Sequence, residues 1–128
     1  MILNKYCILI DDDEDDQLIF ESVINKHYID FDLLCYDSAQ EGIKSISNIE
    51  KSNLSAIFLD LNMPRVNGIE CLKTLRKDPR LNRTPIVIYS TSNNPQDVNE
   101  ALLNKADAFI TKPSKITNLV EEIKPYLK

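Results

Sequence analysis

The stretch Cys7–Gln17, CILIDDDEDDQ, sets four apolar residues directly before six consecutive acids. The apolar half continues from Tyr6 and has the aliphatic content of a buried strand. The acids that follow repel one another, so a folded chain keeps them together only where a cation, a helix end or a ligand compensates. We therefore expect a buried strand over Tyr6–Ile10 whose carboxyl end carries acidic side chains.

Short apolar runs alternate with helical patterns along the rest of the chain. Further strands are predicted at Phe31–Tyr36, Ala56–Leu59, Ile86–Tyr89 and Ala108–Thr111. A helical pattern separates each strand from the next, and another follows the last strand. This alternation predicts an α/β fold, in which helices cover both faces of a five-stranded parallel sheet.

Capping residues and prolines mark where the later helices begin and end. Asn94 stands before a proline and starts a helix that is predicted to run to about Lys105. Ser114 is predicted to cap the last helix, and Pro125 to end or kink it. The polar segment 47–53 is predicted to be a loop.

Composition limits the class of protein. The chain has 128 residues, enough for one domain with a sizeable core. Its 20 acids outnumber its 15 bases and no basic block occurs, so binding to nucleic acid or to an anionic membrane surface is not expected. Three widely spaced cysteines indicate reduced thiols, and neither a signal peptide nor a membrane span is recognisable. We expect a single cytoplasmic domain over residues 1–128.

Polar side chains follow four of the predicted strands at the point where each strand ends. Asp11 and Asp12 follow the first strand, Asp60 the third, Ser90 the fourth and Lys112 the fifth. Open α/β sheets bind ligands beyond the carboxyl ends of their strands, so these side chains are expected to gather at one edge. Carboxylate oxygens suit Mg²⁺ or Mn²⁺, and a carboxylate can attack phosphorus while a lysine and a hydroxyl neutralise charge. The set predicts metal-assisted phosphoryl transfer.

Four segments in order, ILIDDDEDD, FLDLNMPRVNG, PIVIYSTS and FITKP, resemble the receiver domain of two-component response regulators. The resemblance covers essentially the whole chain. It implies a flavodoxin-like, doubly wound fold with strand order 2-1-3-4-5, and a stand-alone receiver without an output domain, similar to chemotaxis receivers. The chain departs from the family at Lys105, because relatives commonly have glycine before the following alanine.

The resemblance also implies roles for single residues. Asp60 would be the phosphoacceptor and Lys112 the residue that binds the phosphoryl group. Asp12 would be a direct ligand of Mg²⁺ or Mn²⁺, and Asp11 a partner that acts largely through metal-bound water. The backbone carbonyl of Asn62 would complete the protein ligands of the metal.

Further implied roles concern the switch and the loops around the site. Ser90 matches the switch hydroxyl, and Phe109 occupies the aromatic switch position. Pro64 and Gly68, together with the methionine before Pro64, would shape the loop behind the acceptor. The family takes a cis peptide bond before the proline that matches Pro113.

The implied function is signalling. The domain would accept a phosphoryl group onto Asp60 from a sensor histidine kinase or a histidine phosphotransfer protein. It would catalyse this Mg²⁺-dependent step and a slow hydrolysis itself. It would signal to an unknown downstream protein through the face made by the fourth helix, fifth strand and fifth helix.

Two other functions remain as alternatives. An Mg²⁺-dependent phosphatase needs a general acid–base two residues beyond its nucleophile, where this chain has Asn62. A receiver-like interaction module that never gains phosphate usually lacks one of the acids or the lysine, and all are present here.

On this interpretation, the six acids of the opening stretch fall into two groups with different roles. Asp11 and Asp12 belong to the site. The acids at 14–16 are expected to start the first helix, where the helix end offsets part of their repulsion. Asp13 is not assigned to either group.

Overall fold

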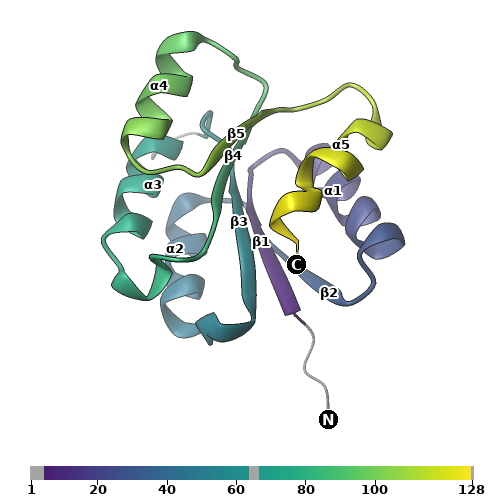
Figure 1. Cartoon of the computed structure of the whole chain (residues 1–128), viewed down its shortest axis with the longest axis horizontal. Coiled ribbons are helices and arrows are strands. Elements are labelled where there is room, and N and C mark those ends of the chain that lie inside the picture. Colours follow the sequence, from purple (N-terminus) through teal and green to yellow (C-terminus); the bar gives the residue numbers. More distant parts are fainter. Residues whose placement is uncertain (1–4, 64–66, 128) are drawn as a thin grey trace.

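Strands and helices alternate along the chain in the computed structural model, which describes residues 5–63 and 67–127 (Figure 1). Within these residues, no helix has both the length and the apolar character needed to cross a bilayer. The strands are β1 (Lys5–Ile10), β2 (Phe31–Tyr36), β3 (Leu54–Leu59), β4 (Ile86–Ser90) and β5 (Ala108–Thr111). The helices are α1 (Glu14–His27), α2 (Ala39–Asn48), α3 (Gly68–Arg76), α4 (Pro95–Leu103) and α5 (Ile116–Ile123), with short 3₁₀ turns η1 (Lys51–Asn53), η2 (Pro79–Leu81) and η3 (Lys124–Tyr126).

The strands form one parallel sheet in the order β2-β1-β3-β4-β5. Helices α1 and α5 cover one face, and α2, α3 and α4 cover the other (Figure 1). Successive side chains of a strand point to opposite faces, so Ile8 and Ile10 pack toward α2 and α3 while Cys7 and Leu9 pack toward α1 and α5. The predicted α/β class and strand order are confirmed.

Several predicted boundaries differ from the structure: β3 begins at Leu54 rather than Ala56, and α4 ends at Leu103 rather than near Lys105. Two further differences have a physical reason. The segment 47–53 is not all loop, because α2 continues to Asn48 and η1 follows. The last helix begins at Ile116 after Lys115, not after Ser114, and it has no side-chain cap. Its buried residues Leu119 and Ile123 lie one turn apart, so packing against the sheet, rather than a cap, stabilises this helix.

The end of α4 is closed by a residue in the left-handed region. Lys105 has a φ of 72° and is the one non-glycine residue with positive φ in the described part of the chain. The N–H of Ala106 donates to the carbonyl of Ala101, and that of Lys105 to the carbonyl of Leu102, each at 3.0 Å. This is the hydrogen-bond pattern of a Schellman cap, where glycine is the usual residue, and it accounts for the departure from the family.

The guanidinium of Arg76, at the end of α3, ties this helix end to its neighbours. Its Nε donates to the carbonyl of Lys105 at 2.9 Å. Its Nη1 donates to the carbonyls of Leu81 at 2.8 Å and Thr84 at 3.1 Å. Its Nη2 lies 2.6 Å from Asp107 Oδ2. One side chain therefore links α3, the turn after it and the α4–β5 loop, far from the carboxyl edge of the sheet.

We expect Lys105→Gly to raise the free energy of unfolding by about 0.5–1 kcal/mol, because glycine relieves the left-handed strain. Urea unfolding of the two proteins measures this difference. As a matched control, Glu100→Gly within the exposed face of α4 should lower the same quantity by about 0.5–1 kcal/mol. A loss of stability in Lys105→Gly would contradict the assigned cap.

Helix α3 starts in contact with the backbone that carries Asp60. A Cβ at Gly68 would lie 2.4 Å from the carbonyl oxygen of Asp60 and 2.5 Å from Leu61 Cα. The N–H of Gly68 donates to the carbonyl of Leu61 at 2.9 Å. Only glycine fits here without moving the β3–α3 backbone. At Gly42 of α2 the corresponding contact is with the side chain of Ile10, at 2.5 Å.

Gly68→Ala should therefore lower the free energy of unfolding by about 2–3 kcal/mol, because two backbone segments must separate. Gly42→Ala should cost less, because a side chain can yield and alanine favours a helix. Thermal unfolding compares the two variants. Equal losses would show that the contact behind Asp60 is not the tighter one.

Candidate functional site

Parallel pairing brings the predicted strand ends to one edge of the sheet. The N–H of Asp60, after β3, donates to the carbonyl of Ile10 in β1 at 2.9 Å. The N–H of Lys112, after β5, donates to the carbonyl of Ser90 in β4 at 2.8 Å. These bonds continue the ladders one residue past the strands, and so they fix where each polar side chain leaves the sheet.

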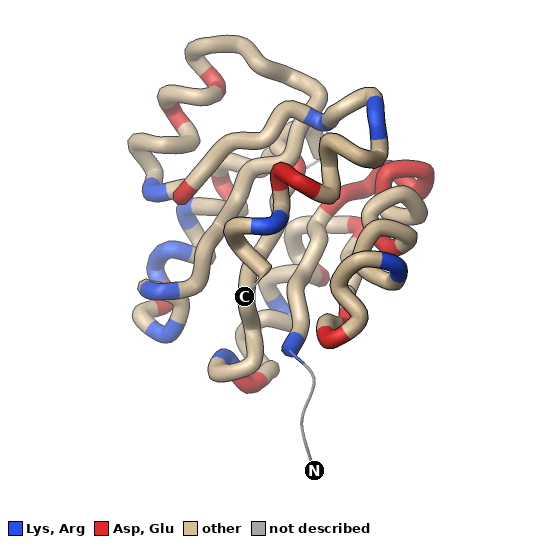
Figure 2. The backbone as a smooth tube through the Cα atoms, turned by 45° about the vertical axis from the view of Figure 1, so that its right-hand side comes forward, with Lys and Arg blue, Asp and Glu red and all other residues tan. Residues whose placement is uncertain are grey.

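Three acids meet at this edge. Carboxylate oxygens of Asp11, Asp12 and Asp60 all lie within 4.8 Å of one another. Asp11 and Asp60 are buried, whereas Asp12 is exposed. Figure 2 shows how acidic residues gather along the β1–α1 connection and the start of α1. The predicted meeting of these acids is thus present in the geometry.

The ammonium of Lys112 lies among the acids. Its Nζ is 2.8 Å from Asp11 Oδ2, 2.6 Å from Asp16 Oδ2 and 3.6 Å from Asp60 Oδ2. The ring of Tyr89 lies on another side of the ammonium, with 5.4 Å between Nζ and the ring centroid. Among the described residues, this one positive charge faces several carboxylates at close range, so they leave the pocket with an excess of negative charge.

Burial and charge perturb the titration of both partners. Burial raises the pKa of Asp11 to about 6, although Lys112 and the N–H of Asp13 act in the opposite direction. Burial alone would lower the pKa of Lys112, but close contacts with Asp11 and Asp16 outweigh it and raise that pKa above its usual range. Lys112 therefore stays a charged ammonium, because the nearby carboxylates stabilise it.

The site fits a divalent cation. Asp11 Oδ2 is buried, and its one close polar neighbour among the described residues is the Lys112 ammonium, 2.8 Å away. The other oxygen of Asp11 accepts from the N–H of Asp13 at 2.9 Å. A buried carboxylate beside two more carboxylates offers the oxygen ligands that Mg²⁺ and Mn²⁺ prefer.

The backbone N–H of Asn62 donates to Asp60 Oδ1 at 3.2 Å, and its side-chain Nδ2 donates to Ser90 Oγ at 3.3 Å. Ser90 is fully buried, and its Oγ also accepts from the N–H of Ser92 at 3.3 Å. The Ser92 hydroxyl in turn donates to Asp97 Oδ2 of α4 at 2.9 Å. A continuous chain of hydrogen bonds therefore runs from Asp60 to α4.

Phe109 lies in β5, beside Ile88 of β4. It is partly buried and packs against the core that α2, α3 and α4 cover. The predicted aromatic position is thus under the helix layer that includes α4.

The acids after Asp12 have separate tasks. Asp13 is the N-cap of α1, because its Oδ1 accepts from the N–H groups of Asp15 at 2.9 Å and Asp16 at 3.2 Å. The acids at 14–16 do start α1, as predicted. That prediction missed the ion pair of Asp16 with Lys112. Only its place one helical turn after the N-cap, on the side facing the strand ends, could have indicated it.

The family resemblance also implied a cis peptide bond before Pro113 and a loop shaped by Pro64. The peptide bond before Pro113 is trans, contrary to the cis bond that the resemblance implied. The trans form is the more stable one for most bonds before proline, by about 0.5–1 kcal/mol. Pro64 lies outside the described residues, and Met63 before it is buried.

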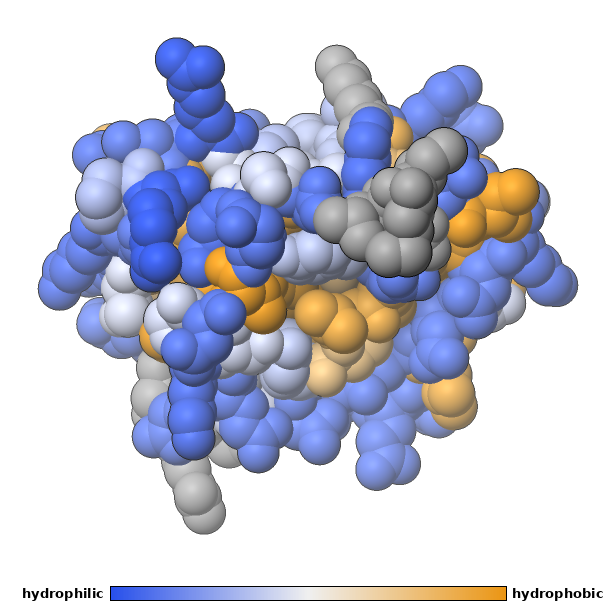
Figure 3. Space-filling model, turned by 90° about the horizontal axis from the view of Figure 1, so that it is seen from below, coloured by the Kyte–Doolittle hydropathy of each residue, from blue (hydrophilic) through white to orange (hydrophobic). Residues whose placement is uncertain are grey.

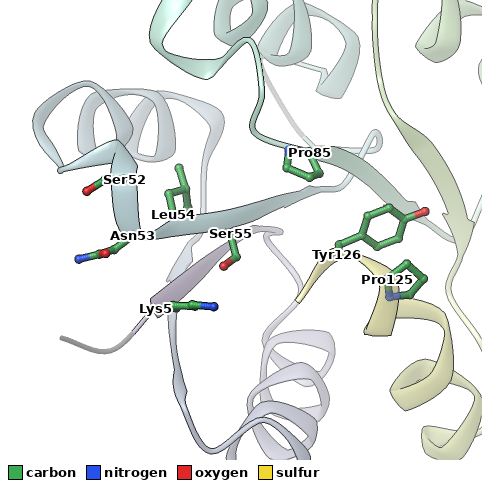
Figure 4. Close-up of a pocket in the computed structure, with 8 residues that line it drawn as sticks. All are labelled: Lys5, Ser52, Asn53, Leu54, Ser55, Pro85, Pro125 and Tyr126. Carbon is green, nitrogen blue, oxygen red and sulfur yellow. The ribbon is translucent and has the colours of Figure 1, made fainter. Parts of the chain in front are cut away.

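A separate pocket of about 430 Å³ lies at the opposite edge of the sheet, where the strands begin (Figure 4). Figure 3 shows this end of the molecule from below, with hydrophobic side chains between polar ones. The pocket contains no acid, and it lies away from the strand ends where the acids and Lys112 meet. The residues lining it are Lys5, Ser52, Asn53, Leu54, Ser55, Pro85, Pro125 and Tyr126.

Comparison with known proteins finds response regulators and their receiver domain among the matches to this chain. The family model of the response regulator receiver domain matches residues 7–124. Response regulator Rcp1 of Synechocystis is 27% identical over 128 residues, covering 93% of this chain and 84% of that protein. Two-component response regulator ARR17 of Arabidopsis thaliana is 37% identical over 83 residues, which cover 65% of this chain and about half, 52%, of that protein.

Solved structures agree with the fold. The Mn²⁺-bound form of Rcp1 has a TM-score of 0.79 at 25% identity, covering 94% of this chain and 90% of that one. Chemotaxis protein CheY4 of Vibrio cholerae has a TM-score of 0.84 at 18% identity, covering 97% and 99%. Since the family model spans nearly all of the sequence, the chain belongs to the family of response regulator receiver domains.

Proposed function

We propose that this chain is a single receiver domain over residues 1–128 that accepts a phosphoryl group on Asp60 from a sensor histidine kinase or a histidine phosphotransfer protein. The observation that carries the proposal is the meeting of Asp11, Asp12 and Asp60 within 4.8 Å, with Lys112 Nζ 3.6 Å from Asp60. Asn62 cannot serve as the acid–base of a phosphatase, because an amide does not titrate.

In the transfer step, a carboxylate oxygen of Asp60 forms a bond to phosphorus as the bond from phosphorus to the histidine nitrogen of the donor breaks. The electron pair of the broken bond stays with that nitrogen. The N–H of Asn62 orients the Asp60 carboxylate through Oδ1. The Lys112 ammonium neutralises charge on the transferred oxygens, and water later hydrolyses the acyl phosphate slowly.

Asp11, Asp12 and Asp60, with the backbone carbonyl of Asn62, would hold Mg²⁺ or Mn²⁺. When bound, the cation supplies positive charge beside the phosphoryl oxygens. The convergence of three carboxylates, two of them buried, supports this assignment. The relative Rcp1 has been solved in a Mn²⁺-bound form.

The signal would pass through Ser90 and Phe109. Ser90 Oγ accepts from Asn62 and Ser92, so a rotation that turns its hydroxyl toward a phosphoryl group on Asp60 would alter both bonds, and Ser92 contacts α4. Phe109 packs under the same helix layer, so its side chain can respond to that change. The face of α4, β5 and α5 would then present a different surface to a downstream protein.

Asp60→Asn should abolish phosphorylation by a small phosphodonor, because the amide is a poor nucleophile. The wild-type protein should incorporate phosphate only with Mg²⁺ or Mn²⁺ present. Mass spectrometry of protein treated with acetyl phosphate measures both results. Incorporation that needs neither Asp60 nor the cation would contradict the mechanism, and steady turnover of small phosphoesters would favour a phosphatase.

Asp12→Ala should weaken Mg²⁺ binding at least about tenfold, because it removes an oxygen ligand. Glu14→Gln is the matched control, since it removes a charge on the same segment outside the cluster, and it should change the affinity little. Calorimetric titration compares the two. An equal loss in both variants would show that the acids attract the cation only through their overall field.

A further inference from the structure

The contact between Lys112 and Asp16 is the shortest that the ammonium makes in the site. Nζ is 2.6 Å from Asp16 Oδ2, in a hydrogen bond, but 3.6 Å from Asp60 Oδ2, which is beyond hydrogen-bond range. The Lys112 side chain is only 8% exposed and that of Asp16 is 22% exposed, so water screens this pair less than a surface pair. Lys112 is therefore held closer to the first turn of α1 than to the proposed acceptor.

The position of Asp16 is itself fixed. The N–H of Asp16 donates to the capping side chain of Asp13. Asp16 therefore stands on a closed helical turn, and its carboxylate faces the lysine from a rigid element. The fully buried Asp11 lies 2.8 Å from the same nitrogen.

We infer that Asp16 is a positioning residue that restrains Lys112 and competes with the phosphoryl group for it. This inference rests on the proposed phosphorylation of Asp60. A phosphoryl group on Asp60 adds negative charge that Lys112 must meet, and Asp16 opposes this in two ways. It holds the ammonium by a charge-assisted hydrogen bond, and its own charge repels the phosphoryl oxygens.

Asp15 provides a matched control for the charge alone. It carries the same charge on the same turn, is exposed, and forms no ion pair with any described residue. Removing either charge changes the net charge of the first turn of α1 by the same amount. Only removal of the Asp16 charge also removes the ion pair that holds Lys112 toward α1.

The test measures the affinity for beryllofluoride, a mimic of the phosphoryl group, at saturating Mg²⁺ in the wild type, Asp16→Asn, Asp15→Asn and Asp60→Asn. Because the chain has no tryptophan, ¹⁹F NMR of the bound anion is a suitable signal. We expect Asp16→Asn to bind about three- to tenfold more tightly than the wild type, and Asp15→Asn to differ by less than about twofold. Thermal unfolding of each variant checks that it is folded.

Equal affinity changes in Asp16→Asn and Asp15→Asn would overturn the inference, because the field alone would then explain them. Weaker binding in Asp16→Asn, or lower stability with unchanged affinity, would also overturn it. These results would leave the proposed function standing, provided that the wild type binds and Asp60→Asn does not. Failure of the wild type to bind, or equal binding by Asp60→Asn, would refute the proposed function and the inference with it.

Discussion

The repulsion among acids at the carboxyl edge of the sheet is the constraint on which the site depends. Asp11 and Asp60 are both buried there, and the ammonium of Lys112, which lies between them, is shared with Asp16 as well. Such a group of charges is costly to fold, and one lysine does not balance it. The fold keeps it because the strand ladders fix the backbone positions and because a divalent cation can supply the missing charge.

The architecture could be predicted from the sequence because each part of it follows from a local pattern. Buried parallel strands appear as short apolar runs, such as Tyr6–Ile10, and the polar residue after each run must emerge at the same edge. The acids, the hydroxyl and the lysine of the site were found in this way. The strand order was implied only by family resemblance, because the alternation of strands and helices is compatible with several orders.

The contacts that the sequence did not predict depend on side-chain reach and on tertiary packing. A lysine has four flexible methylene groups, so the position of Lys112 in the chain could not show that its ammonium lies nearest Asp16. The start of the last helix was misplaced because Ser114 has the chemistry of a cap, whereas burial of Leu119 and Ile123 decides where that helix forms. Lys105 takes a conformation that its residue type disfavours, and only the glycine of relatives at this position indicated it.

The two ends of α4 are held by hydrogen bonds to different parts of the molecule. Arg76 fixes the backbone just after the carboxyl end of this helix to α3 and its following turn. The amino end of α4 is instead joined to Ser90 through Ser92 and Asp97, all beside the acids. The two ends of α4 therefore depend on hydrogen bonds at opposite edges of the sheet, and only those at its amino end lead back to Ser90.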